Sequence, residues 1–191
     1  MKIALYPGSF NPVHSGHIHL ARAVVDQQLA DEVWLVISPR NPLKESNLLQ
    51  DENHREAMTR LAIAGEKGLL ASTIEFSMPR PSYTIETIRR IKQLHPDDEF
   101  ILLIGSDNAL IFNQWKDYQQ LLTMVELFVY PRRGYSTEDA LQLYPEMKSL
   151  NTPYFDISST QLREWIRKGN DTGDWLHPDV LQYIRSNHLY R

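Results

Sequence analysis

The sequence predicts an α/β fold: an open parallel sheet with helices on both faces and a small helical extension at the C-terminus. Short apolar runs alternate with segments of helical periodicity along the first 156 residues, and this alternation is typical of β-α-β crossover units. Runs such as Phe100–Ile104 are continuously apolar, as expected of strands covered on both faces. Only helical patterns follow, and 191 residues suit one domain. We therefore expect a single domain, 1–191, with an α/β core at 1–156 and a helical part at 157–191.

Five apolar runs predict the strands, and residues that favour turns close several of them. The first run ends at Pro7-Gly8 and the second at Ser38-Pro39. In order along the chain, the expected strands are Ile3–Tyr6, Val33–Ile37, Leu70–Phe76, Phe100–Ile104 and Val125–Tyr130. In an open parallel sheet, ligands bind beyond the carboxyl ends of the strands. The segments that follow these strands are therefore where we expect the chemistry to lie.

Apolar side chains at helical intervals predict the helices. The first helix begins near Ser15 or Gly16, shortly after the first strand ends. The others are expected at Arg55–Ala64, Ile85–Leu94, Ser159–Lys168 and Pro178–Asn187. Each of the first three lies between two successive predicted strands, as a crossover helix does in a parallel sheet.

The composition excludes several classes of chemistry. Without cysteine, the chain can have no disulfide, iron–sulfur cluster, thiolate zinc site or thiol nucleophile. Its 20 basic and 24 acidic residues give a net charge of −4, whereas proteins that bind nucleic-acid polymers usually carry a basic excess or cluster. We find neither the apolar core of a signal peptide nor an apolar run of about 20 residues that could span a membrane. The expectation is a cytoplasmic protein without a nucleic-acid or membrane partner.

The strongest candidate site follows the first strand, at Tyr6-Pro-Gly-Ser-Phe-Asn-Pro-Val-His14-Ser-Gly16-His17. The helix that begins here presents unpaired backbone N–H groups and a positive dipole end, which favour phosphate. His14 and His17 can face the same side and donate hydrogen bonds to phosphate oxygens, while Gly8 lets a ligand approach the backbone. No P-loop or Gly-x-Gly-x-x-Gly motif is present, and the pair lacks a third ligand for a metal site. We predict a phosphate site without a protein-held metal.

A second candidate lies at the start of a C-terminal helix. Ser158 and Gln161 have the spacing of a capping box, and Ser159 and Arg163 share a helix face. Arg163 can grip phosphate oxygens through two guanidinium nitrogens. By itself, this pattern also describes an ordinary capped helix with an exposed arginine.

A third candidate follows the fourth strand. Gly105 permits close approach at a strand end, Asp107 can accept hydrogen bonds from ribose hydroxyls, and Trp115 offers a flat surface for stacking. A tryptophan in the core is the equally acceptable interpretation of Trp115.

Some basic residues also follow strand ends, where anions would bind. Lys44 follows the second strand, and Arg132 and Arg133 follow the fifth. We favour Lys44 over the two arginines, although each is also compatible with a solvated loop charge. Arg55 lies inside a predicted helix and is interpreted as structural.

These segments together resemble the His-x-Gly-His nucleotidyltransferase superfamily, adenylyl and cytidylyl transferases of Rossmann-like fold. Within it, they are most similar to the bacterial nicotinate mononucleotide adenylyltransferases. Five segments carry the resemblance and extend over nearly the whole chain. They are His14-Ser-Gly-His17, Pro81-Ser-Tyr-Thr84, Ile104-Gly-Ser-Asp107 followed by Trp115, Ser158-Ser-Thr-Gln-Leu-Arg163, and the closing Leu189-Tyr-Arg191.

The resemblance implies an enzyme of NAD biosynthesis that transfers the adenylyl group of ATP to nicotinate mononucleotide and releases pyrophosphate, with Mg²⁺ bound together with ATP. The residues implied in catalysis are His14, His17 and Arg163. Those implied for ATP are Gly8, Ser9, Phe10, Gly16, Gly105, Asp107, Ser159 and Thr160. Those implied for the mononucleotide are Lys44, Tyr83, Thr84, Trp115 and Arg132.

Two departures from this family leave alternatives open. Pro7 stands where the bacterial nicotinate enzymes usually have Gly, and Asn11 stands where they usually have Asp. Tyr6-Pro-Gly-Ser-Phe10 is closer to the pantetheine-phosphate adenylyltransferases, although those chains are shorter and lack the later motifs. The pantetheine reaction is therefore one alternative, and a nucleotide-binding module without catalysis is another. Residue types distinguish neither nicotinate from nicotinamide mononucleotide nor one oligomeric state from another.

Overall fold

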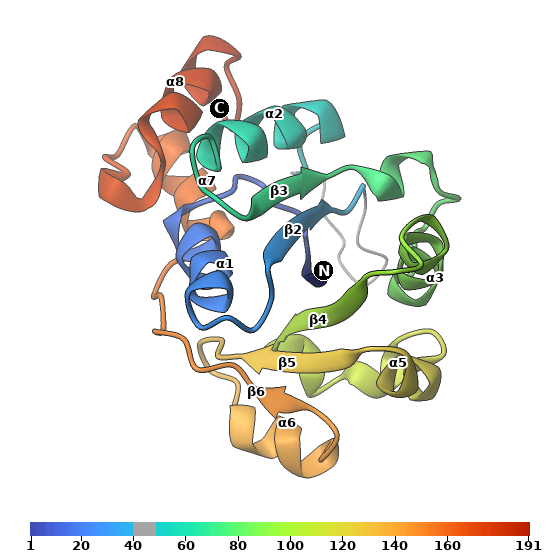
Figure 1. Ribbon diagram of the computed structural model, residues 1–191. Helices are drawn as coiled ribbons and strands as arrows, with labels where there is room; N and C mark the ends of the chain where they lie inside the picture. Colours follow the sequence, from blue (N-terminus) through green and yellow to red (C-terminus); the bar gives the residue numbers. More distant parts are fainter. Residues whose placement is uncertain (40–48) are drawn as a thin grey trace.

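The computed structural model describes residues 1–39 and 49–191 and shows a parallel sheet between two layers of helices (Figure 1). The strands of the described residues are β1 (Lys2–Gly8), β2 (Glu32–Ile37), β3 (Leu69–Ser72), β4 (Glu99–Gly105), β5 (Glu126–Tyr130) and β6 (Lys148–Ser149). Their order is β3-β2-β1-β4-β5-β6, and every neighbouring pair is parallel. The predicted α/β class is confirmed, and the order reverses between β1 and β4, where an open sheet forms its ligand crevice.

The helices cover both faces of this sheet. The α-helices are α1 (Ser15–Asp26), α2 (Glu52–Ala62), α3 (Thr84–Leu94), α4 (Ser106–Ala109), α5 (Tyr118–Met124), α6 (Thr137–Leu143), α7 (Ser159–Lys168) and α8 (Pro178–Ser186). Three 3₁₀ turns complete the set: η1 (Ile74–Ser77), η2 (Phe112–Gln114) and η3 (Gly173–Trp175). Buried side chains of α1, α2, α7 and α8 join one core, and those of α3 to α6 join the other.

Strand β4 illustrates why the central runs are continuously apolar. Ile101 and Leu103 belong to the core beneath α1 and α2, whereas Leu102 and Ile104 belong to the opposite core. All four side chains are at most 2% exposed. Since successive side chains point to opposite faces of a sheet, a strand buried on both faces needs an apolar residue at every position.

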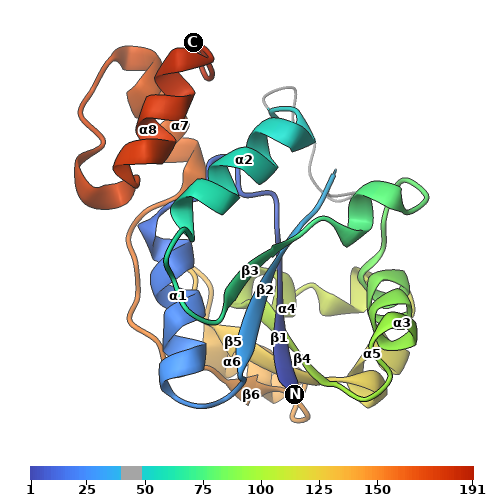
Figure 2. The ribbon, with the colours of Figure 1, turned by 45° about the horizontal axis from the view of Figure 1, so that its top comes forward.

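The C-terminal helices pack onto the first half of the chain. Figures 1 and 2 show α7 and α8 beside α2 at one end of the molecule. The His54 ring of α2 lies within hydrogen-bond distance of the Tyr183 hydroxyl of α8, with Nδ1 and Oη 2.9 Å apart. The predicted helical part at 157–191 thus shares a core with the sheet. In the described part of the chain, no helix is both long and apolar enough to cross a membrane.

The predicted strand at Leu70–Phe76 is wrong in its second half. Strand β3 ends at Ser72, and Ile74–Ser77 forms the 3₁₀ turn η1. This turn buries Glu75, whose carboxylate accepts hydrogen bonds from the hydroxyls of Ser82 and Thr87 at 2.8 and 2.9 Å. These hydrogen bonds hold the turn out of the sheet. Their donors, Ser82 and Thr87, lie outside the apolar run from which the strand was predicted.

Candidate active site

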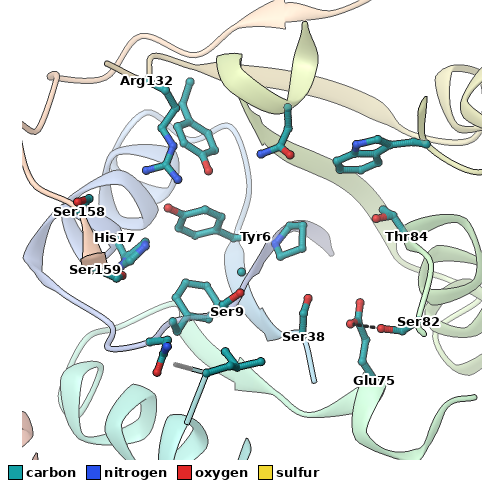
Figure 3. A pocket seen from close by; sticks show the side chains of 18 of the residues that line it. Tyr6, Ser9, His17, Ser38, Glu75, Ser82, Thr84, Arg132, Ser158 and Ser159 are labelled. Atoms are coloured by element: carbon teal, nitrogen blue, oxygen red, sulfur yellow. Dashed lines mark hydrogen bonds between the residues drawn. The ribbon is translucent and has the colours of Figure 1, made fainter. Parts of the chain in front are cut away.

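Two cavities open beside the carboxyl ends of the central strands, with volumes of about 550 and 340 Å³. Figure 3 shows the larger one, with His17 and Ser159 on one side, Ser82 and Thr84 on the opposite side, and Tyr6 between them. Among the described residues, six line both cavities: Tyr6, His14, His17, Tyr130, Arg132 and Ser158. The two cavities therefore meet at the histidine motif predicted from the sequence.

His14 and His17 lie together at the start of α1. His14 is the N-cap residue, and the two ring centroids are 3.7 Å apart. The backbone N–H of His14 donates a hydrogen bond to Nδ1 of His17 at 3.2 Å. Because Nδ1 accepts in this contact, neutral His17 carries its ring proton on Nε2. The helix N-terminus thus selects the tautomer in which Nε2 is the hydrogen-bond donor.

His14 is a neutral group at neutral pH. Its side chain is 4% exposed, and burial, assisted by the nearby charge of Arg132, lowers its pKa from 6.5 to about 3. Its Nδ1 atom is buried and lies in a capping box with the backbone N–H of His17 at the start of α1. Because His14 also lines both cavities, it can contact a ligand there as a neutral ring.

The lowered pKa of His14 predicts a pH dependence of stability. Below pH 6.5 the unfolded chain takes up a proton at His14 that the folded protein binds only near pH 3. The unfolded state binds more protons in this window, so the free energy of unfolding falls as the pH falls, by up to about 1.4 kcal/mol per unit. Denaturant unfolding between pH 6.5 and 4.5 should give a shallower slope for His14→Gln than for the wild type. The exposed His19 provides the control: equal slopes for His14→Gln and His19→Gln would contradict the assignment.

Helix α7 is docked on the loop that follows β1. Its N-cap residue Ser158 accepts a hydrogen bond from the backbone N–H of Gln161, as predicted. The Ser159 hydroxyl donates to the carbonyl oxygen of Pro12 at 2.9 Å. Arg163 Nη1 donates to the carbonyl oxygen of Asn11 at 2.8 Å. The motifs at the two ends of the chain are thus joined by direct contacts.

Arg163 has donor capacity beyond that contact. Its Nη2 donates to the hydroxyl of Thr160 at 3.1 Å, while Nε is buried without a partner among the described residues. Arg163 and Thr160 both line the larger cavity. A guanidinium held from two sides and facing a cavity is suited to bind an anion in a defined position.

Glycines make room for the polar side chains of the site. A Cβ at Gly105 would collide with Oδ1 of Asp107 and would lie 3.0 Å from Cγ of Arg132. A Cβ at Gly16 would lie 3.1 Å from the ring of His14. Gly16 and Asp107 line the smaller cavity, whereas Gly105 lies against Asp107 and supports its position. The predicted need for small residues here has its physical reason in these close contacts.

The buried ring of Phe10 packs against His17. Its backbone adopts a left-handed φ of 45°, which costs a non-glycine residue roughly 1–2 kcal/mol. The ring is 2% exposed, and its centroid lies 5.1 Å from that of His17. A Cβ at Gly8 would lie 2.8 Å from the Phe10 ring. Phe10, Gly8 and Ser9 line the larger cavity.

The two neighbouring arginines after β5 differ in position. Arg132 lines both cavities, and its Nε lies 3.6 Å from Oδ1 of Asp107. Arg133 lines only the smaller cavity, has a side chain 73% exposed and pairs with Asp156 at 2.9 Å. The structure therefore distinguishes two residues that the sequence left equivalent.

Trp115, Tyr83 and Thr84 line the far end of the larger cavity. Trp115 packs against Phe112, with ring centroids 5.3 Å apart, so it is both a packing residue and a cavity residue. Its Nε1 is buried without a partner in the described residues. Thr84 begins α3, whose N-cap residue has no side-chain cap. An aromatic wall and the first residue of α3 thus face the same space.

Lys44 lies outside the described residues, so its predicted contact with substrate stays a prediction. Every other predicted site residue except Gly105 lines one of the two cavities. Sequence reasoning missed several wall residues, among them Tyr6, Glu75 and Tyr130. Tyr6 lies near the carboxyl end of β1 and Tyr130 ends β5, which was a usable signal. Glu75 had none, because its segment was interpreted as a strand.

Comparison with known proteins agrees with the motifs. Residues 5–165 match the family model described as cytidylyltransferase-like. The chain is 41% identical over 183 residues to a Bacteroides fragilis protein named "Probable nicotinate-nucleotide adenylyltransferase", covering 96% of this chain and 90% of that one. A Flavobacterium johnsoniae protein of the same name is 36% identical over 192 residues and covers all of both chains.

The fold is also shared with solved structures. The Plasmodium falciparum nicotinic acid mononucleotide adenylyltransferase complexed with NaAD superimposes with a TM-score of 0.83, at 24% identity, over 99% of this chain and 97% of that one. The same enzyme complexed with APC gives a TM-score of 0.82. From the family model and the full-length relatives, this chain belongs to the cytidylyltransferase-like family and, within it, to the nicotinate-nucleotide adenylyltransferases.

Proposed function

We propose that the protein transfers the adenylyl group of ATP to nicotinate mononucleotide, giving nicotinate adenine dinucleotide and pyrophosphate in NAD biosynthesis. The observation that supports this most directly is the pair of cavities that meet at His14 and His17. A binding module for one nucleotide needs one cavity, whereas a transferase must bring two ligands together at one point. Family membership and the names of the relatives support the same reaction.

In this proposal, the two cavities together receive the two substrates, and the triphosphate of ATP extends into the part of the larger cavity that Arg163 lines. The larger one, with Trp115 and Tyr83 in its wall, takes the mononucleotide and stacks its pyridine ring. The smaller one, with Asp107 in its wall, takes the adenosine of ATP, and the Asp107 carboxylate accepts hydrogen bonds from the ribose. The phosphates of both then meet beside His14 and His17.

The chemistry follows from this placement. The 5′-phosphate of the mononucleotide attacks the α-phosphorus of ATP in line, and pyrophosphate leaves on the opposite side. The protein acts by positioning and by stabilising charge, without a covalent intermediate. His17 donates from Nε2 to a phosphate oxygen, neutral His14 contacts the same group, and Arg163 holds the departing pyrophosphate.

A divalent metal, Mg²⁺ in our proposal, accompanies ATP. In the described residues, no group of three or more His, Asp or Glu side chains is arranged to hold a metal ion. In this proposal the cation would be held mainly by triphosphate oxygens and water. When bound there, Mg²⁺ neutralises part of the phosphate charge.

A pyrophosphate-release assay with three acceptors tests the function. Nicotinate mononucleotide, nicotinamide mononucleotide and phosphopantetheine are each supplied with ATP, and the products are separated by chromatography. We expect the highest kcat/KM with nicotinate mononucleotide. Preference for phosphopantetheine would overturn the proposed substrate, and ATP binding without pyrophosphate release from any acceptor would overturn the proposed reaction.

Replacing Trp115 with alanine tests the placement of the pyridine ring. Loss of a stacking surface should raise the KM for the mononucleotide about tenfold and change the KM for ATP much less. Trp34 is the matched control: its Nε1 donates to Glu32, its ring packs against His95, and it lines neither cavity. If Trp115→Ala changes both KM values as little as Trp34→Ala does, Trp115 serves packing alone.

A further inference from the structure

Arg55 of α2 is a buried guanidinium beneath the site. Its side chain is 0% exposed. Nε donates to the carbonyl oxygen of Gln50 at 2.9 Å, and Nη2 donates to that of Pro39 at 3.0 Å. Nη1 donates to the carbonyl oxygens of Ser9 and Ser38 at 2.8 and 2.7 Å. One side chain therefore ties together the segment after β1, the segment after β2 and the residue that precedes the α2 cap.

The carboxylates of Glu52 and Asp51 lie near enough to act on the charge of Arg55, but neither contacts its guanidinium directly. Among the described residues it forms no ion pair, and all its hydrogen bonds go to backbone carbonyls. Burial lowers its pKa from the ordinary value, but a guanidinium in a protein stays protonated. A buried cation that no carboxylate contacts directly extends its field further than a solvated one, because the protein interior screens charge less than water does.

The carbonyl groups bound to Arg55 belong partly to the wall of the larger cavity. Ser9 and Ser38 both line that cavity, whereas Arg55 lines neither cavity. Their carbonyl oxygens therefore point into the protein, behind the wall, and not toward a bound ligand. Carbonyl oxygens repel anions, so holding them behind the wall makes this edge of β1 and β2 favourable for a phosphate group.

We infer that Arg55 is a positioning residue for phosphate binding: it fixes the carbonyls of Ser9, Ser38 and Pro39 away from the larger cavity and adds positive potential behind its wall. Arg55 acts through these segments and does not touch the substrate. The inference rests on the proposed function for the identity of the phosphate, that of the mononucleotide. It assigns a role in substrate binding to a residue that sequence alone marks as structural.

A purely structural Arg55 and a positioning Arg55 make different predictions. Loss of a structural residue lowers the melting temperature but leaves the folded fraction with unchanged ligand affinities. Loss of a positioning residue weakens binding of a ligand that carries the phosphate and spares one that lacks it. Nicotinate mononucleotide and nicotinate riboside differ only in the 5′-phosphate. Comparing their dissociation constants therefore isolates the contribution of the phosphate to binding.

The experiment compares Arg55→Lys and Arg55→Met with wild type, using calorimetric dissociation constants for these two ligands without ATP. Lysine keeps the charge but lacks the planar donor fork. We expect mononucleotide binding to weaken about tenfold in Arg55→Lys and about 100-fold in Arg55→Met, with riboside binding changed less than about threefold. Arg60→Met is the control, because Arg60 lies on the same helix, 58% exposed, and pairs with Glu56 at 2.8 Å.

The outcome in folded protein decides the inference, with folding checked by circular dichroism and thermal melting. If Arg55→Met does not fold, Arg55→Lys carries the same comparison. Equal weakening of both ligands, or no change in either despite a lower melting temperature, would overturn the positioning role. A wild type that binds the mononucleotide yet makes no dinucleotide would overturn the proposed function and leave the Arg55 comparison valid.

Discussion

Replacement of His17 by alanine is expected to lower kcat by about 10²- to 10³-fold while the protein remains folded. His17 lines both cavities, at the point where the two sets of phosphates meet in the proposed reaction. Its Nδ1 accepts from the backbone N–H of His14, so in the proposed reaction Nε2 is the ring atom that would donate to a phosphate oxygen. The donor matters most where charge develops in the transition state, so the effect should fall on kcat more than on either KM.

His19 provides the matched control for this substitution. It lies two residues along the same helix, is exposed, and stacks on Phe155 with ring centroids 5.3 Å apart. Steady-state kinetics of His17→Ala and His19→Ala, with melting temperatures of both, separate catalysis from folding. A His17→Ala enzyme with kcat close to that of His19→Ala would remove His17 from the mechanism.

Replacement of Arg163 by alanine is expected to lower kcat/KM for ATP about 100-fold. Two losses combine in this variant. The guanidinium that faces the larger cavity disappears, and so does the hydrogen bond from Nη1 to the carbonyl oxygen of Asn11. The first loss removes a cation from the pyrophosphate, and the second loosens the contact between α7 and the loop that carries His14.

Two further variants separate these losses. Arg163→Lys keeps a cation but cannot grip two oxygens in one plane, so it should recover part of the activity. Arg167 lies one turn further along α7, is exposed, and lines neither cavity, so Arg167→Ala should be neutral. Kinetics with ATP varied at saturating mononucleotide provide the measurement. If Arg163→Ala and Arg167→Ala have the same kcat/KM, Arg163 is not part of the phosphate site.

The structure explains one of the two departures from the usual family motif, Asn11, but not the other, Pro7. The Asn11 side-chain oxygen accepts hydrogen bonds from the hydroxyl of Tyr190 at 2.7 Å and from the backbone N–H of Gln50 at 3.3 Å. An acceptor is all that these contacts require, and an Asn oxygen serves as well as an Asp oxygen. Pro7 lines the larger cavity at the end of β1. The structure gives no reason for proline rather than glycine at that position.

The sheet was predictable because its strands are buried on both faces. The predicted runs at β1, β2, β4 and β5 agree with the structure to within two residues at each end, since continuous burial leaves a local apolar signal. The short elements were not predicted. Strand β6 has two residues, and α5 and α6 have seven each, too few for periodicity to stand out. Their formation depends on packing against neighbours from elsewhere in the chain.

The sequence by itself indicated the candidate chemistry, because the residues after the strands, together with their spacing, identify histidines at a helix start, an arginine in a capped helix and an aspartate close to a glycine. Only the tertiary structure decided how they act together. It docks Ser159 onto Pro12, places Arg132 rather than Arg133 between the cavities, and buries His14 until its pKa falls to about 3. The reason is physical: residue type and spacing are local properties, whereas burial, charge environment and contact across about 150 residues of chain arise only when the helices pack onto the sheet.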